Sequence, residues 1–240
     1  MKHLFLLATA ATLSFLSANA QSDANTTVIQ GAFQEFNSNG GRTGVDFHAP
    51  EATIGSPYLF DKWVKGTVVT ATDTVVANPG YRFNYNKMTG VLLVTQDQQT
   101  YIALDKGSFK AFTLSDPLGN LHSFEVVRSV NPNSFVEVVT KGNKYAIYKL
   151  IKTKYKKADY RTDGLTESGD KENQYIDEFE YYVVNVSAKA APAAKFSLKK
   201  KSIKEAFGAG GPNVDAYFAQ HKDDDINEAF VKELGEYLNQ

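Results

Sequence analysis

The chain has 240 residues, with 26 lysines and arginines against 27 aspartates and glutamates, and it contains no cysteine. The lack of cysteine excludes disulfide bonds, thiol catalysis and cysteine metal ligands, and a net charge of −1 favours no class of charged partner. A chain of this length can bury its own core as one or two domains.

The first twenty residues have the pattern of a secretory signal peptide. Lys2 and His3 precede an apolar run over 4–16, and small residues at 18 and 20 form a cleavage site. The apolar run is too short to span a bilayer, so an uncleaved membrane anchor is the weaker alternative. We therefore expect a cleaved signal over 1–20 and a periplasmic or extracellular mature chain. A protein without disulfides fits a bacterial periplasm.

Short β-branched and aromatic runs alternate with turn residues from residue 54 onward. The preceding residues, 21–53, are weakly patterned and predict a flexible N-terminal arm. The predicted strands are 64–70, 74–77, 81–86, 91–95, 100–104, 109–114, 121–127, 135–139, 145–155 and 174–186, with a last short strand near 196–198. Many close strands with Gly and Pro turns predict a mainly β domain over 54–198, an antiparallel β-meander that forms a barrel or a sandwich.

Two of these strands carry a prediction about burial. In 81–86, aromatic residues alternate with polar ones, so one face is expected to be buried and the other wet. In 109–114, apolar residues occur at both parities, which indicates a strand buried on both faces.

The last residues, 199–240, predict short α-helices that pack on the β domain. Ser202 and Glu205 have the spacing of a capping box, and Gly208 is the expected end of that helix. Asp225 and Glu228 form a second such pattern, followed by apolar residues at helical spacing.

A basic tract over 141–161 is the most conspicuous candidate for binding. Lysines alternate there with tyrosines, a composition that can contact a polyanion such as lipopolysaccharide or an acidic glycan. The candidate contacts are Lys149, Lys152, Lys154 and Tyr155. The following stretch, 163–180, is acidic, so the two segments can instead pair as a long hairpin with opposite charges facing each other. The charge pattern favours this structural pairing, and no contact with nucleic acid is expected.

Aromatic residues near the start of the β domain are candidates for a ligand cavity. In a small barrel, Tyr58, Trp63, Tyr81 and Tyr85 could line such a cavity. The more frequent role of residues of this kind is to fill a core. Both readings stay open at the level of the sequence.

The motifs of catalysis and metal binding are weak. The acidic run at 221–225 lacks the spacing of a calcium loop, the histidines are far apart, and Ser56 is followed by proline rather than placed in a nucleophile elbow. We therefore predict no catalytic, metal or cofactor-binding residues. Paired carboxylates acting on a glycan remain an alternative, because the sequence does not give their separation.

Several short motifs occur in an order that resembles a group of uncharacterised exported proteins of Bacteroidota. The motifs are Ser56-Pro57-Tyr58-Leu59, Gly66-Thr67-Val68-Val69, Arg82-Phe83-Asn84-Tyr85-Asn86, Phe112-Thr113-Leu114, the pair Tyr181-Tyr182 and the run 196–202. The resemblance spans Ser56 to Leu238 and departs from the group's pattern at Phe83 and at 208–211. It implies export and a β fold, and it supplies no catalytic residue.

Together these features predict an exported, non-enzymatic cell-envelope protein that serves as a binding or accessory module, with an envelope protein or a glycan as its partner. One alternative is a small-ligand carrier with an aromatic-lined β-barrel cavity. The other is a glycan-active hydrolase that uses paired carboxylates.

Overall fold

The structure is a computed structural model that describes residue 47 and residues 53–188, 192–208 and 211–240. The predicted signal peptide, and the predicted arm except for residues 47 and 53, lie outside these residues. In the described ranges, no helix is both long and apolar enough to cross a lipid bilayer.

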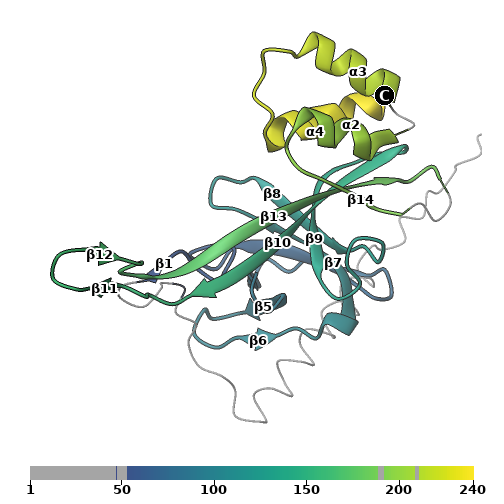
Figure 1. The fold of residues 1–240 in the computed structure, drawn as a ribbon. Helices are drawn as coiled ribbons and strands as arrows, with labels where there is room; N and C mark the ends of the chain where they lie inside the picture. Colours follow the sequence, from purple (N-terminus) through teal and green to yellow (C-terminus); the bar gives the residue numbers. More distant parts are fainter. Residues whose placement is uncertain (1–46, 48–52, 189–191, 209–210) are drawn as a thin grey trace, which may run out of the picture.

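The described chain is mainly β, as predicted, and one large sheet organises it (Figure 1). This sheet has nine strands in the order β1-β13-β10-β9-β8-β7-β2-β3, with β14 also paired to β13. Its pairs are antiparallel except for β1 with β13. The strands are β1 (Thr53–Ile54), β2 (Lys65–Thr70), β3 (Val75–Val76), β7 (Phe109–Ser115), β8 (Leu121–Val126), β9 (Phe135–Lys141), β10 (Tyr145–Lys156), β13 (Asn173–Asn185) and β14 (Ala194–Phe196).

A second, three-stranded sheet packs against the large one. It consists of β4 (Arg82–Asn86), β5 (Val91–Thr95) and β6 (Ile102–Ala103). Strand β2 pairs with β3 and β7, and three of the four strands between β2 and β7 in the chain, β4–β6, leave the large sheet to form the small one. The sheets are not closed into a barrel, so the sandwich-like form of the two predicted architectures is the one observed.

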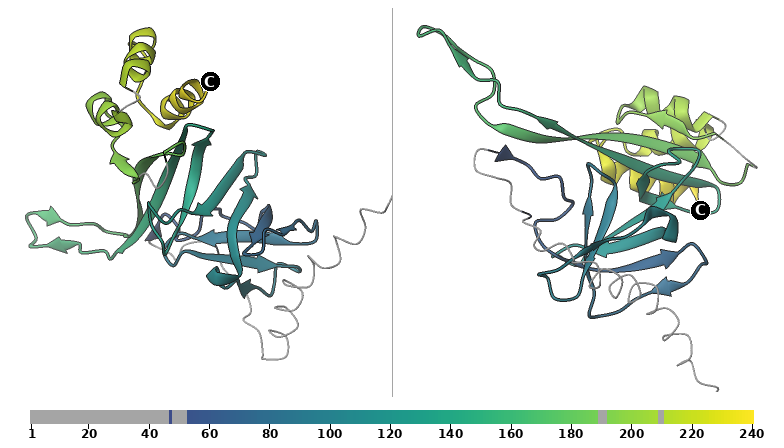
Figure 2. Two further views of the ribbon diagram at one scale, coloured as in Figure 1. Left: turned by 90° about the vertical axis from the view of Figure 1, so that its right-hand side faces the viewer. Right: turned by 90° about the horizontal axis from the view of Figure 1, so that it is seen from below.

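Two apolar clusters hold these layers together. The first, here called the sheet core, lies between the small sheet and the large one and includes Phe83, Phe112 and Phe124. The second, the helix core, lies between the C-terminal helices and the large sheet and includes Ile147 and Leu234. The helices are α2 (Lys200–Phe207), α3 (Gly211–Gln220) and α4 (Glu228–Leu238), and they cover one end of the large sheet (Figure 2).

The outer halves of β10 and β13 form an arm that projects from the body (Figures 1 and 2). The two strands pair in antiparallel register from Tyr145 opposite Asn185 to Lys156 opposite Gln174, which confirms the predicted long hairpin. Its tip carries the short strands β11 (Arg161–Thr162) and β12 (Glu167–Ser168), which the sequence pattern did not predict.

The helix caps differ from the predicted ones. Helix α2 begins before Ser202, whose hydroxyl accepts a hydrogen bond from the Ser197 amide instead of capping the helix. Helix α4 is capped by Asn227, whose side chain accepts from the Phe230 amide, so the prediction of Asp225 as the cap is wrong. Gly208 does end α2, as predicted, with a positive φ of 45°.

Strand β7 is not buried on both faces, because a bulge explains its pattern. Lys110 is exposed, and the pairing with β2 shifts register between Val69 and Thr70. The extra residue allows Phe109 and Phe112, three positions apart, to enter the same sheet core.

The polar face predicted for 81–86 is also wrong at Asn84, which is 0% exposed. Its side-chain amide donates to the carbonyl oxygens of Phe60 and Lys62, and its carbonyl oxygen accepts from the Phe60 and Tyr85 amides. A buried amide is tolerated because its bonds are satisfied. Asn84 thereby fastens the aromatic segment before β2 onto the small sheet.

We expect Asn84→Ala to lower the free energy of unfolding by about 3 kcal/mol, because it leaves several buried backbone groups without partners. Urea unfolding followed by Trp63 fluorescence measures this loss. Asn86→Ala is the control, since Asn86 serves an exposed turn and its loss should cost only about 1 kcal/mol. Equal effects of the two substitutions would contradict the role given to Asn84.

Candidate functional site

The four aromatic residues predicted for a cavity lie in two different places. Tyr58 and Trp63 are half-buried and meet Phe47 edge to face, with ring centroids 5.0 and 4.9 Å away. Tyr81 and Tyr85 are buried in the sheet core. The structure therefore does not gather all four around one space.

Tyr85 is the member of this set that combines burial with access to a pocket. Its ring packs against Phe112 and Phe124 at centroid distances of 5.3 and 5.4 Å, and the residue is 4% exposed. Within the described part of the chain this hydroxyl forms no hydrogen bond, and burial of the residue raises its pKa. Because the residue also lines a pocket, that hydroxyl is available to a ligand or to water.

This pocket, called here the Tyr85 pocket, has a volume of about 250 Å³. It lies between the β4–β5 turn, the β8–β9 loop and the part of β10 that extends beyond its pairing with β9. Its lining contains no aspartate or glutamate and is rich in hydroxyl, amide and ammonium groups. The polar residues that line it are Tyr85, Lys87, Thr89, Asn131, Ser134, Lys152 and Thr153.

The β4–β5 turn owes its shape to Asn86 and Gly90. The side-chain oxygen Oδ1 of Asn86 accepts from the backbone amides of Met88 and Thr89 at 3.1 and 3.0 Å. Gly90 has a φ of +66°, a conformation that favours glycine. A Cβ at Gly90 would lie 2.9 Å from the Lys106 ammonium and 3.5 Å from the Tyr85 hydroxyl. Glycine is therefore required at this buried turn position, which lies beside two polar groups.

A second hollow, of about 460 Å³, lies next to the first and shares Ser134 with it. Lys106 lines this hollow and donates a hydrogen bond to the Thr89 carbonyl oxygen at 3.2 Å. Within the described ranges, no carboxylate forms an ion pair with Lys106. Lys87, by contrast, is paired with Asp177, which also accepts a hydrogen bond from Thr153.

The basic tract is largely occupied by internal ion pairs, as the structural alternative predicted. Lys154 lies 2.7 Å from Glu178, and Lys152 lies 2.9 Å from Glu180. Glu180 also binds Lys195, and hydrogen bonds from the two lysines lower its pKa to about 2. The remaining candidates are Tyr155, which is exposed beside the Tyr175 ring, and Lys149, which is largely buried. Only Lys152 of this set lines the Tyr85 pocket.

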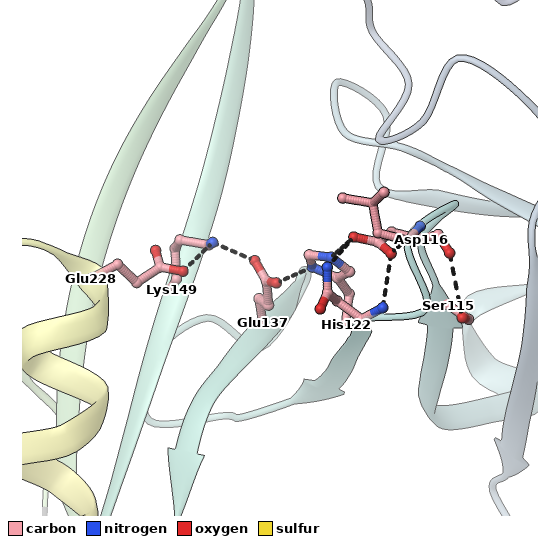
Figure 3. A network of polar contacts seen from close by, with 8 residues as sticks. Ser115, Asp116, His122, Glu137, Lys149 and Glu228 are labelled. Carbon is pink, nitrogen blue, oxygen red and sulfur yellow. Dashed lines mark hydrogen bonds and ion pairs between the residues drawn. The ribbon is translucent and has the colours of Figure 1, made fainter.

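Lys149 belongs to a row of charged side chains that crosses the large sheet (Figure 3). Its ammonium lies 2.6 Å from Glu137 and 2.9 Å from Glu228 of α4. Glu137 in turn lies 2.7 Å from His122, and Asp116 lies 3.7 Å from the other ring nitrogen of His122. We call these five residues the charged row.

Strand register builds the charged row and sets its place between the two cores. Glu137 stands opposite Phe124 of the sheet core, and Lys149 stands opposite Tyr181 of the helix core. Sequence reasoning missed Glu137 and His122, which lie 15 residues apart in a strand pattern without a motif. The register between β8 and β9 brings them together, and a single sequence does not fix that register.

The pKa shifts in the charged row indicate that Glu137 stays ionised and that its negative charge is balanced by His122 and Lys149. The hydrogen bond to Glu137 raises the pKa of His122, against the opposing effect of partial burial. Burial by itself would raise the pKa of Glu137, but His122 and Lys149 hold it below its usual value. A carboxyl group held ionised between two cations is poorly suited to act as a general acid.

Among the described residues, no group of three or more His, Asp and Glu side chains converges as a metal site. His221, in the acidic run considered above, instead lies 2.8 Å from Asp224. Comparisons with protein-family models, curated proteins and solved structures give no match to this chain.

We expect Glu137→Gln to lower the free energy of unfolding by about 3 kcal/mol, because it leaves the largely buried Lys149 with only its half-exposed partner Glu228. Chemical denaturation measures the change. Glu178→Gln removes an exposed ion pair and should cost about 0.5 kcal/mol or less. If the two variants lost similar amounts of unfolding free energy, the charged row would contribute no more to stability than an exposed ion pair, contrary to this prediction.

The charged row also predicts how stability changes with pH. Since the pKa of His122 is raised in the folded protein, its contribution is complete below the unfolded value of about 6.5 and is lost as pH rises through the folded pKa. An NMR titration of His122 should therefore give a midpoint above 6.5, and His122→Gln should remove this part of the pH dependence. A midpoint below about 6.5 would show that the contact with Glu137 does not outweigh the effect of burial on the pKa of His122.

Tyr85→Phe tests whether the Tyr85 hydroxyl lacks an internal partner. Removing it should change the free energy of unfolding by less than about 0.5 kcal/mol, because within the described ranges this hydroxyl makes no hydrogen bond that would be lost. Tyr148→Phe is the matched control, since that buried hydroxyl donates to Glu125 at 2.7 Å and its removal should cost about 1 kcal/mol or more. Thermal and urea unfolding compare the two variants, and an equal cost would mean that Tyr85 has an internal partner.

Proposed function

We propose that this protein is an exported, non-enzymatic binding or accessory module of the bacterial cell envelope, and that it binds a small polar ligand in the Tyr85 pocket. The pattern of residues 1–20 supports export to the periplasm or beyond. The observation that carries the binding proposal is the Tyr85 pocket itself, a hollow of about 250 Å³ whose described lining joins the edge of an aromatic core to hydroxyl, amide and ammonium groups.

The chemistry of the pocket supports binding rather than catalysis. Its lining supplies hydrogen-bond donors and acceptors from Thr89, Asn131 and Ser134 and contains no carboxylate to serve as an acid or base. The nearby Asp177 is held by Lys87 and Thr153, and Glu137 is held within the charged row. These contacts weigh against the alternative of a glycan hydrolase.

The ligand-carrier alternative is kept here without its closed barrel. The open sheet excludes a closed barrel with an internal cavity. A pocket at the junction of two sheets still allows a small ligand to bind beside an aromatic core. Tyr85 belongs both to the lining of this pocket and to the sheet core.

Ligand-detected and amide-detected NMR on the purified mature protein test this proposal. A panel of sugars, amino acids and small organic acids should contain a compound that shifts resonances at 86–90, 131–134 and 150–153. Tyr85→Phe should weaken that binding, whereas Tyr148→Phe should leave it unchanged. A panel without a single compound that shifts these residues would reject the Tyr85 pocket as the binding site.

A further inference from the structure

The distribution of charge around the Tyr85 pocket indicates which chemical class of ligand fits it. Two lysines line the pocket, and a third, Lys106, donates to Thr89 at its rim, while no carboxylate belongs to the lining. Lys87 is neutralised by Asp177, and Lys152 shares Glu180 with Lys195. The lysines around the pocket therefore carry more positive charge than their carboxylate partners neutralise.

Lys106 is the cation that this arrangement leaves for a ligand. Its ammonium forms one hydrogen bond, to a neutral carbonyl oxygen, and within the described ranges no acid pairs with it. A Cβ atom at Gly90 would lie 2.9 Å from this ammonium, so only glycine fits at that position. The Tyr85 hydroxyl lies 3.5 Å from the same point. The Lys106 ammonium and the Tyr85 hydroxyl therefore lie close together, both next to the buried Gly90.

A carboxylate fits these two donors better than a neutral group does. Hydrogen bonds between ionised partners are shorter and about twice as strong as neutral ones. The neutral polar side chains that line the two hollows carry hydroxyl groups or, at Asn131 and Asn133, amides, and these pair well with ligand hydroxyls. The adjoining hollows also give room for more than a single small anion.

We infer that the Tyr85 pocket binds a hydroxylated carboxylate, such as a uronic acid sugar, with its carboxylate on Lys106 and Tyr85 and its hydroxyls toward Ser134 and Thr89. This inference rests on the proposed binding function and adds the class of ligand. It identifies Lys106 as the residue that distinguishes acidic from neutral ligands.

Isothermal titration calorimetry of the full mature protein with galacturonate and with galactose tests the inference. Galacturonate should bind and galactose should bind about tenfold more weakly or not at all, since the neutral sugar lacks the charged contact. Succinate and inorganic phosphate serve as further arms. Succinate binding as tightly as galacturonate, or phosphate binding more tightly, would overturn the hydroxylated carboxylate as the ligand class.

Variants locate the carboxylate contact. Lys106→Met should weaken galacturonate binding about tenfold or more, and Lys106→Arg should retain most of it because the charge remains. Lys154→Met is the matched control, since that lysine lies on the arm and pairs with Glu178. Thermal unfolding of each variant shows that the fold is intact.

The outcomes separate this inference from the proposed function. If galactose binds as well as galacturonate and Lys106→Met changes nothing, the acidic ligand class is wrong while binding in the Tyr85 pocket stands. If neither sugar nor any other compound of the NMR panel shifts the residues around Tyr85, both proposals fail.

Discussion

The antiparallel pairing of β10 with β13 is the interaction on which the rest of the structure depends. These long strands form one continuous ladder whose inner half takes part in the helix core and whose outer half is the projecting arm (Figure 1). Strand β9 adds to one edge, and β14 and β1 add to the other. Without this hairpin the helices would have no sheet to cover, and the β7–β9 strands would lose their edge partner.

The charged row divides the apolar face of the large sheet into two cores. Burying ionised side chains is costly, and their mutual contacts offset much of that cost only when each charge has a well-placed partner. Here Lys149 lies between Glu137 and Glu228, so the row ties helix α4 to the centre of the sheet. Together with the Tyr181 hydroxyl, which donates to Glu228, and with Asn239, which bonds the start of β10, this contact holds α4 against the sheet.

The Tyr85 pocket arises where the two sheets meet and the ladder of β9 and β10 ends. Strand β9 pairs with β10 only as far as Glu137 opposite Lys149, and the pocket occupies the space beyond that point, against Leu150 and Thr153. The small sheet supplies Tyr85 and the Gly90 turn. The pocket is thus a consequence of a strand that stops early and of a turn that packs against the exposed ladder edge.

The sequence by itself determined the strands other than the short β1, β11 and β12, together with the long hairpin and the C-terminal helices, because alternation, turn residues and helical spacing are local properties of the chain. It also indicated that the lysine-rich and acidic segments pair, since charge complementarity follows from the two stretches alone. It misplaced the helix caps and the environment of Asn84, where tertiary contacts override local preference. Only the tertiary structure decided that β4–β6 leave the large sheet, that His122 meets Glu137, and that Lys106 lies beside Tyr85 and Gly90. These arrangements depend on strand register and on packing between distant segments, which leave no pattern in a single sequence.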